Sequence, residues 1–259
     1  MTSLLNKLSC LTLKNEGEVL SSSDKDKFDK FMSNLIPCHD KHIIYRGESL
    51  SNLKRQFNVD NENSLAKLIF IIGEKSKSFF TRFILMPEDT SKINFSKILT
   101  ELGKVLLSSG KGSKGRVKCM THFIDQNRSF YNAVTNSDQR DKLLLSYENL
   151  AVKDRKIINL FYLVLLHTIN SCSYKTNSTC LSTSISLSVA GHFSTDILFV
   201  GWYPTADTFE HNGGIVINDN IGDNYKGIPL CKPVYKSQRE ISLRYGFLPH
   251  FIIGFLSKN

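Results

Sequence analysis

The chain lacks any apolar run that approaches the roughly 18 residues of a membrane-spanning helix. Its longest apolar runs, 68–72 and 160–166, have the lengths of buried strands or helix segments. The N-terminus, 1–13, contains scattered leucines but no continuous apolar stretch followed by a small-residue cleavage site. We therefore expect no secretory signal, no membrane as a partner, and a cytoplasmic protein.

Closely spaced cysteine pairs are also missing. The six cysteines are spread along the chain without a Cys-x-x-Cys motif. Cys38-His39 with His42 is the only metal-like grouping in the sequence, and no second cluster completes the four ligands of a zinc site. In a chain of this size without a secretory signal, we expect reduced cysteines. We expect none of them to be catalytic, and we expect no metal.

The chain has no internal repeat and no low-complexity tract, and 41% of its 259 residues are hydrophobic, which is ordinary globular composition. Apolar periodicity predicts helices at 24–36, 64–80, 94–107, 138–150 and 154–168. Short apolar segments between turn residues predict strands at 42–46, 179–184, 197–202, 214–218, 240–244 and 250–255. Helices first and strands later, with no linker, favour a single α+β domain over 1–259.

Acidic residues are in the minority, with 24 Asp and Glu against 33 Lys and Arg, for a net charge of +9. A basic surface suits a polyanionic partner such as nucleic acid, although many small basic enzymes bind none. The segment 108–118 has three glycines and four cations but no acid. It does not have the spacing of a phosphate-binding Walker loop, because position 105 is Val and Gly112 follows Lys111. Two interpretations stay open for it: a solvated loop, or an arm that contacts nucleic acid.

Arg46 ends the predicted strand at 42–46, between Tyr45 and Gly47. A guanidinium in this position can hold a pyrophosphate with two parallel hydrogen bonds. A glycine beside it lets the backbone approach a ligand closely. Taken alone, the tripeptide favours a strand-edge arginine in a surface salt bridge.

A Leu-Ser-Thr-Ser string at 181–184 ends a second predicted strand and precedes a predicted short helix within 186–193. Either Ser186 or Ser188 can cap that helix. We expect three of its side chains to pack inward: Val189, Ala190 and Phe193.

Gln238 and Glu240 lie at the start of the predicted strand 240–244, and alternation places both on one face. Taken alone, the tripeptide favours a polar pair at a strand edge. The other interpretation is a fixed carboxylate that serves chemistry at an anomeric carbon. Breaking a bond to that carbon builds oxocarbenium charge, which a carboxylate hydrogen-bonded to the sugar 2′-OH stabilises. Glycosidases meet the same charge problem.

Three motifs in this order resemble the Arg/Ser-Thr-Ser/Glu class of ADP-ribosyltransferases: Tyr45-Arg46-Gly47, Leu181-Ser182-Thr183-Ser184 and Gln238-Arg239-Glu240. The resemblance is to toxins of the Gln-x-Glu type, such as those of bacterial toxin–antitoxin and phage-defence systems. It covers 24–60 and 155–259. It implies an ADP-ribosyltransferase-like split β-sandwich with a helical N-terminal part. More residues separate Arg46 from Ser182 along the sequence than in compact toxins of the class, which suggests a helical insertion at about 85–135.

The resemblance implies an enzyme that cleaves NAD+, its substrate, and needs no metal. Its catalytic residues would be Glu240, Gln238 and Ser182, where the serine supports the glutamate and the nicotinamide ribose. Its NAD-binding residues would be Arg46, Tyr45, Gly47, Thr183, Ser184 and Phe193.

Position 238 bears on the acceptor of ADP-ribose. Members of the class with Glu at this place usually modify arginine, whereas a glutamine amide offers both a donor and an acceptor to a nucleobase or a side-chain amide. We therefore expect a nucleobase of RNA or DNA, in an intracellular toxin that has an antitoxin protein as a further partner. Two alternatives stay open: transfer to Asn or Gln of a protein such as a small GTPase, and a non-catalytic NAD-binding module.

Overall fold

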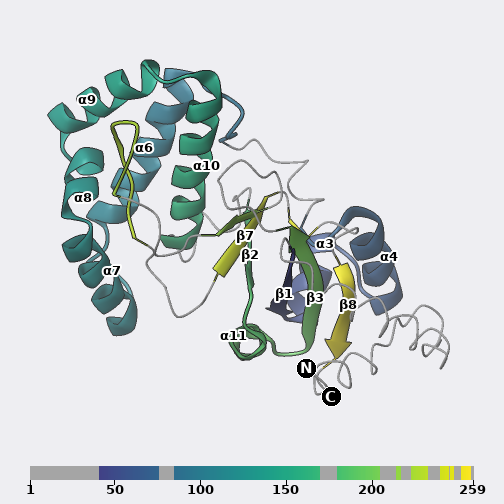
Figure 1. Ribbon diagram of the computed structural model, residues 1–259. Helices are drawn as coiled ribbons and strands as arrows, with labels where there is room; N and C mark the ends of the chain where they lie inside the picture. The colour runs from purple at the N-terminus through teal and green to yellow at the C-terminus, as the bar shows by residue number, and fades with distance from the viewer. Residues whose placement is uncertain are drawn as a thin grey trace. The chain divides into compact units, whose positions relative to one another are not determined.

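The computed structural model describes residues 41–75, 85–169, 180–204, 214–216, 223–232, 240–244, 246–247 and 252–257 (Figure 1). The predicted helix at 24–36, the Cys38-His39 pair and Gln238 lie outside these ranges. The chain divides into two compact units. Unit 1 comprises Met1–Arg82, Leu181–Gly214 and Gln238–Asn259, and unit 2 comprises Phe83–Cys180 and Ile215–Ser237. The single domain predicted over 1–259 stays a prediction.

A mixed helical and β structure is confirmed, and its main sheet has the strand order β4-β7-β2-β1-β3-β8. The bounds of these strands are β1 Lys41–Glu48, β2 Cys180–Ser184, β3 Ile197–Pro204, β4 Gly214–Val216, β7 Glu240–Arg244 and β8 Ile252–Ser257. β1 runs antiparallel to both β2 and β3, and β3 runs antiparallel to β8. β1 pairs with β3 over its whole length, from Lys41 opposite Pro204 to Glu48 opposite Ile197. β1 is therefore a central strand, paired on both sides.

Among the described residues, β1 is followed directly by α3, Leu50–Phe57, and α4, Glu62–Ile72. The Asn61 side chain caps α4 by accepting from the Ser64 amide. The sequence predicted this helix to run to residue 80, but it ends at Ile72. Gly73 has a positive φ of 89°, which an α-helix does not accommodate. The next residue, Glu74, forms an isolated antiparallel bridge with Phe247.

The described part of unit 2 contains the helices α6 Lys92–Leu107, α7 Lys114–Gln126, α8 Arg128–Thr135, α9 Ser137–Glu148 and α10 Val152–Ile169. α10 is buried on every side from Ile157 to Ile169, as its nearly all-apolar middle predicts. Phe95 and Tyr147 stack with ring centroids 4.0 Å apart, and Tyr162 meets Phe95 edge to face. These large aromatic side chains form the centre of the unit 2 core.

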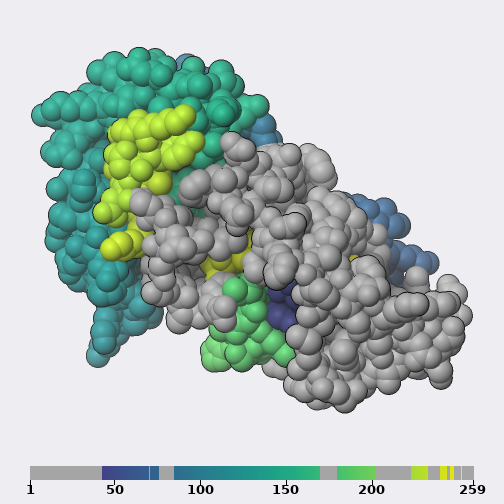
Figure 2. Space-filling model, in the orientation of Figure 1, coloured from purple at the N-terminus to yellow at the C-terminus, as the bar shows by residue number. Residues whose placement is uncertain are grey.

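A small hairpin, β5 Asn224–Tyr225 and β6 Ile228–Pro229, lies over α8 and α9 on the surface of unit 2 (yellow-green in Figure 2). The Tyr225 hydroxyl and the Lys226 ammonium both reach Asp154, at 2.9 and 2.7 Å. The Tyr162 hydroxyl donates to the Pro229 carbonyl at 2.8 Å. These contacts fix the hairpin to unit 2 at two points.

The segment 108–118 was predicted to be a loop throughout, and that is wrong for its second half. The Ser113 hydroxyl accepts from the Arg116 amide and caps α7, which begins at Lys114. Lys111, Lys114 and Lys118 are all exposed. The glycines on both sides of Ser113 lower the helix propensity of this stretch and hid the helix start. In the described part of the chain, no helix combines the length and apolarity needed to cross a membrane.

Candidate functional site

The three motifs found in the sequence lie on three neighbouring strands of unit 1. Arg46 is on β1, Ser182–Ser184 end β2, and Glu240 begins β7, in the sheet order β7-β2-β1 (Figure 1). Two of the described hydrogen bonds connect these strands through motif residues, one from Arg46 to β2 and one from Thr183 to β7. Segments far apart in the sequence thus form one continuous part of the sheet.

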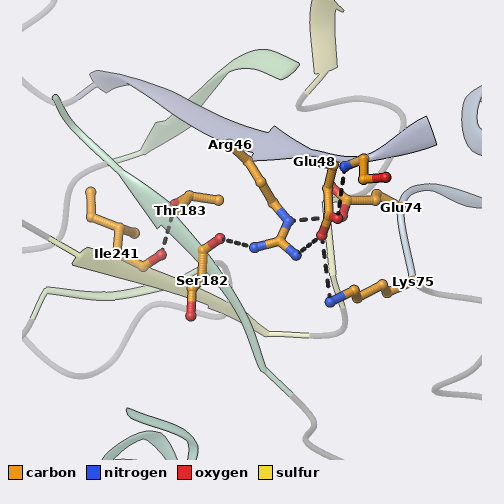
Figure 3. A network of polar contacts seen from close by, with 8 residues as sticks. Arg46, Glu48, Glu74, Lys75, Ser182, Thr183 and Ile241 are labelled. Atoms are coloured by element: carbon orange, nitrogen blue, oxygen red, sulfur yellow. Dashed lines mark hydrogen bonds and ion pairs between the residues drawn. The ribbon is translucent and has the colours of Figure 1, made fainter. Parts of the chain in front are cut away.

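Arg46 donates to three protein acceptors (Figure 3). Its Nε contacts Glu74 Oε1 at 2.7 Å, its Nη1 contacts the Ser182 carbonyl at 2.6 Å, and its Nη2 pairs with Glu48 Oε1. These contacts use three of the five N–H donors of a guanidinium. The side chain is only 12% exposed, so the surface salt bridge suggested by the tripeptide is replaced by a largely buried one.

Two carboxylates and one ammonium surround this guanidinium. Lys75 Nζ lies 3.7 Å from Glu48 Oε1. Burial raises the pKa of Glu74 to about 7, against the lowering effect of Arg46. Burial also acts to raise the pKa of Glu48, but Arg46, Lys75 and the Ser49 amide outweigh it and hold that pKa below its ordinary value. Burial opposes the charge of Arg46, but Glu74 and Glu48 together raise its pKa further.

The Ser-Thr-Ser residues connect β2 to its neighbours by different groups. Ser182 contributes its backbone carbonyl to Arg46. Thr183 is buried, and its hydroxyl donates to the Ile241 carbonyl of β7 at 2.7 Å. Ser184 lies opposite Tyr45 of β1, and its Oγ accepts from the Ser186 amide at 3.0 Å, where the chain leaves the strand. This motif holds β1, β2 and β7 together.

α11, Leu187–Phe193, confirms the short helix predicted after the Ser-Thr-Ser motif, with Ser186 as its cap. Ala190 is buried as predicted, and Val189 is half-buried. The inward packing predicted for Phe193 is wrong, because its side chain is 57% exposed. Phe193 is the last helical residue, and its backbone, rather than its ring, lies against Gly47. Its proposed contact with NAD stays a prediction.

Replacing Ser186 by alanine is expected to lower the free energy of unfolding by about 1 kcal/mol, the usual value of a lost N-cap. The Ser186 hydroxyl is the one that accepts from the Val189 amide at the start of α11. Urea denaturation measures the change. Ser188→Ala is the matched control, because Ser188 is exposed and lies inside the helix. A larger loss for Ser188→Ala than for Ser186→Ala would contradict this assignment.

Packing in the fold requires glycine at position 47, which the sequence did not reveal. A Cβ at this position would come within 3.0 Å of three backbone atoms of α11 and its C-cap: the Ala190 oxygen, the Ser194 nitrogen and the Phe193 carbonyl carbon. Only glycine allows β1 and α11 to approach so closely. The neighbouring Tyr45 is 7% exposed, and burial raises its pKa. The close approach at Gly47 is therefore to α11, and contact of Gly47 or Tyr45 with NAD stays a prediction.

Glu240 is the first residue of β7, and its side chain is half-buried. The Ser242 hydroxyl donates to its Oε1 at 3.0 Å. Ile241 and Leu243 alternate with these residues and are buried at 1% and 0% exposure. Ser242 is also buried, so β7 is enclosed on both faces at 241–243, and the half-buried Glu240 carboxylate lies at the start of the strand.

The three charged residues around Arg46, which are Glu48, Glu74 and Lys75, were missed in the sequence. Glu48 could have been found, because it lies two residues after Arg46 on the same strand and therefore on the same face. Glu74 carried no local signal, because its position depends on the end of α4 and on the bridge to Phe247. Within the described ranges, no group of three or more His, Cys, Asp and Glu side chains could hold a metal ion.

Comparison of the chain with models of protein families, with curated protein sequences and with solved structures finds no match.

Proposed function

We propose that this protein is a mono-ADP-ribosyltransferase that cleaves NAD+ and transfers ADP-ribose to a macromolecule. One observation supports this most: the Arg46, Ser-Thr-Ser and Glu240 motifs occupy the adjacent strands β1, β2 and β7. The resemblance implies that the three motifs contribute to one site, and their adjacent strands support this although the segments lie far apart in the chain. The proposal implies that the sheet belongs to an ADP-ribosyltransferase-like split β-sandwich.

In the proposed reaction, the bond between nicotinamide and the ribose anomeric carbon breaks, and its electron pair leaves with neutral nicotinamide. An acceptor nitrogen bonds to that carbon and releases a proton to water. Glu240 hydrogen-bonds the ribose 2′-OH and stabilises the oxocarbenium charge. Ser242 holds the Glu240 carboxylate from the same strand. Ser182 supports the glutamate and the ribose, and Gln238 orients the acceptor.

For the acceptor we propose a nucleobase of RNA or DNA. The net charge of +9 supports a polyanionic target, and so do the exposed lysines at 111, 114 and 118. The Gln-x-Glu motif and the resemblance to toxin–antitoxin and phage-defence enzymes support an intracellular toxin. Transfer to Asn or Gln of a protein is the alternative, and treatment of the labelled product with nuclease or protease distinguishes the two acceptors.

Glu240→Gln is expected to lower the rate of nicotinamide release from NAD+ by at least about 100-fold, because it removes the charge that stabilises the transition state. NAD+ affinity should change little, since the carboxylate acts mainly on the transition state. Nicotinamide release by chromatography and NAD+ binding by calorimetry measure the two effects. The matched control is Glu62→Gln, which changes an exposed glutamate on α4. Equal turnover by both variants would contradict the catalytic role of Glu240. NAD+ binding without turnover by any variant or by the wild type would leave only the non-catalytic NAD-binding module.

A further inference from the structure

Arg46, Glu48, Glu74 and Lys75 form a compact charge cluster in unit 1 (Figure 3). Glu74 is fully buried, and only one of its carboxylate oxygens, Oε1, accepts from Arg46. Its second oxygen, Oε2, is buried and has no hydrogen-bond partner among the described residues. A buried carboxylate oxygen without a donor is costly, and a proton on that oxygen removes its charge.

The backbone fixes Glu74 in this position. The Gly73 amide donates to Ile69 at the end of α4, and the Glu74 amide donates to the Phe247 carbonyl at 3.0 Å. Lys75 then adopts a positive φ of 64°, which is uncommon for a residue with a side chain. These contacts fix the backbone of Glu74, and its buried carboxyl lies against Arg46.

The charged groups that face Glu74 are Arg46 and Glu48 from β1 and Lys75 from its own segment, while Phe247 is the apolar partner in its bridge. With both carboxylates ionised, the two positive and two negative charges cancel. With one carboxylate protonated, the cluster carries one positive charge. Glu74 is the site for that proton, because it is the more buried of the two and its pKa is raised to about 7.

We propose that Glu74 is a positioning residue of the NAD site, which holds the guanidinium of Arg46 and takes up a proton when the pyrophosphate of NAD+ binds beside it. The proposal rests on the proposed function, which places the pyrophosphate at Arg46. An anion binds more tightly to a positive cluster than to a neutral one, so its binding favours the protonated cluster. By linkage, NAD+ affinity then depends on pH.

The test is titration calorimetry of NAD+ into the full chain in two buffers with different ionisation enthalpies, between pH 6 and pH 8.5. Glu240→Gln is the background, so that NAD+ is not consumed. The expected result is uptake of a fraction of a proton near pH 7 and a dissociation constant that rises by up to about tenfold for each pH unit above 7. Proton uptake is read directly in this background, so it does not require a Glu74 variant that folds.

Glu74→Gln, added to the same background, keeps an oxygen for Arg46 Nε but cannot ionise. It is expected to bind NAD+ with the affinity seen at low pH and without pH dependence. Glu74→Ala should also lose the pH dependence, and it should bind more weakly than Glu74→Gln at every pH because Arg46 loses the partner that positions it. Glu62→Gln should keep the full pH dependence. A pH-independent affinity with no proton uptake in the background protein would overturn this inference alone. Absence of NAD+ binding, together with absence of turnover by the wild type, would overturn the proposed function.

Discussion

Gly47→Ala is expected to lower the free energy of unfolding by about 3 kcal/mol, at the upper end of the usual cost of overpacking. The added Cβ would lie within 3.0 Å of backbone atoms at Ala190, Phe193 and Ser194. Backbone atoms cannot rotate away as a side chain can, so α11 as a whole must move away from β1. Because the Ser-Thr-Ser motif leads directly into α11, we expect the variant to lose NAD+ turnover as well.

Urea denaturation measures the effect of Gly47→Ala, and Gly191→Ala is the matched control. Gly191 lies within α11, and an added Cβ there meets no atom within 4 Å. Alanine at this helical position should leave the stability unchanged or raise it by about 0.5–1 kcal/mol. If both variants are as stable as the wild type, then α11 does not pack on β1 as described.

Arg46→Ala is expected to lower the free energy of unfolding by about 3–5 kcal/mol at neutral pH, the usual cost of removing one partner from a buried ion pair. Glu48 and Glu74 would face each other without the guanidinium between them. The loss should also depend on pH. The pKa of Glu74 is already raised in the folded protein, and without Arg46 it rises further above its unfolded value. Stability is then greatest at low pH and falls as pH rises through 7.

The stability of Arg46→Ala is measured by urea denaturation at pH 5 and pH 8, with Arg55→Ala on the exposed face of α3 as control. Adding Glu74→Gln to Arg46→Ala should recover part of the loss at pH 8, because it removes the uncompensated charge. Such a cycle isolates the coupling between the two residues. A loss no larger than that of Arg55→Ala, at both pH values, would show that the buried network does not contribute to stability.

Strong periodic patterns in the sequence predicted the strand that carries Glu240 and three helices of unit 2. The strand at 240–244 and the helices at 94–107, 138–150 and 154–168 correspond to β7, α6, α9 and α10. Their periodicity follows directly from burial on one face or on all faces. Within the ranges that the structure describes, the sequence missed the helices α3, α7 and α8 and the β5–β6 hairpin. α3 and α8 span only eight residues each, and the hairpin strands only two, so their patterns are weak.

The sequence predicted the strands on which the candidate residues lie. It did not predict the tertiary contacts that bring other residues to them. The strands that hold Arg46, Ser182 and Glu240 were predicted from short apolar segments, and the role of these residues in an NAD site stays a prediction. The role of Glu74 could not be predicted from the sequence. It depends on where α4 ends, at Ile72 before Gly73, and on the bridge between Glu74 and Phe247. The sequence predicted that Gly47 lets the backbone approach a ligand. The structure shows that it lets β1 approach α11, which depends on helix packing that the sequence does not reveal.

The most direct test of the proposed activity is incubation of the purified protein with NAD+ labelled in its adenylate part and a whole-cell lysate, followed by nuclease treatment of one half and protease treatment of the other. We predict labelled macromolecules that disappear with nuclease, survive protease, and are absent when Glu240→Gln replaces the wild type. Label that disappears with protease instead would assign the acceptor to a protein. Intact NAD+ with no labelled macromolecule, and no difference between the wild type and Glu240→Gln, would contradict ADP-ribosyl transfer by this protein.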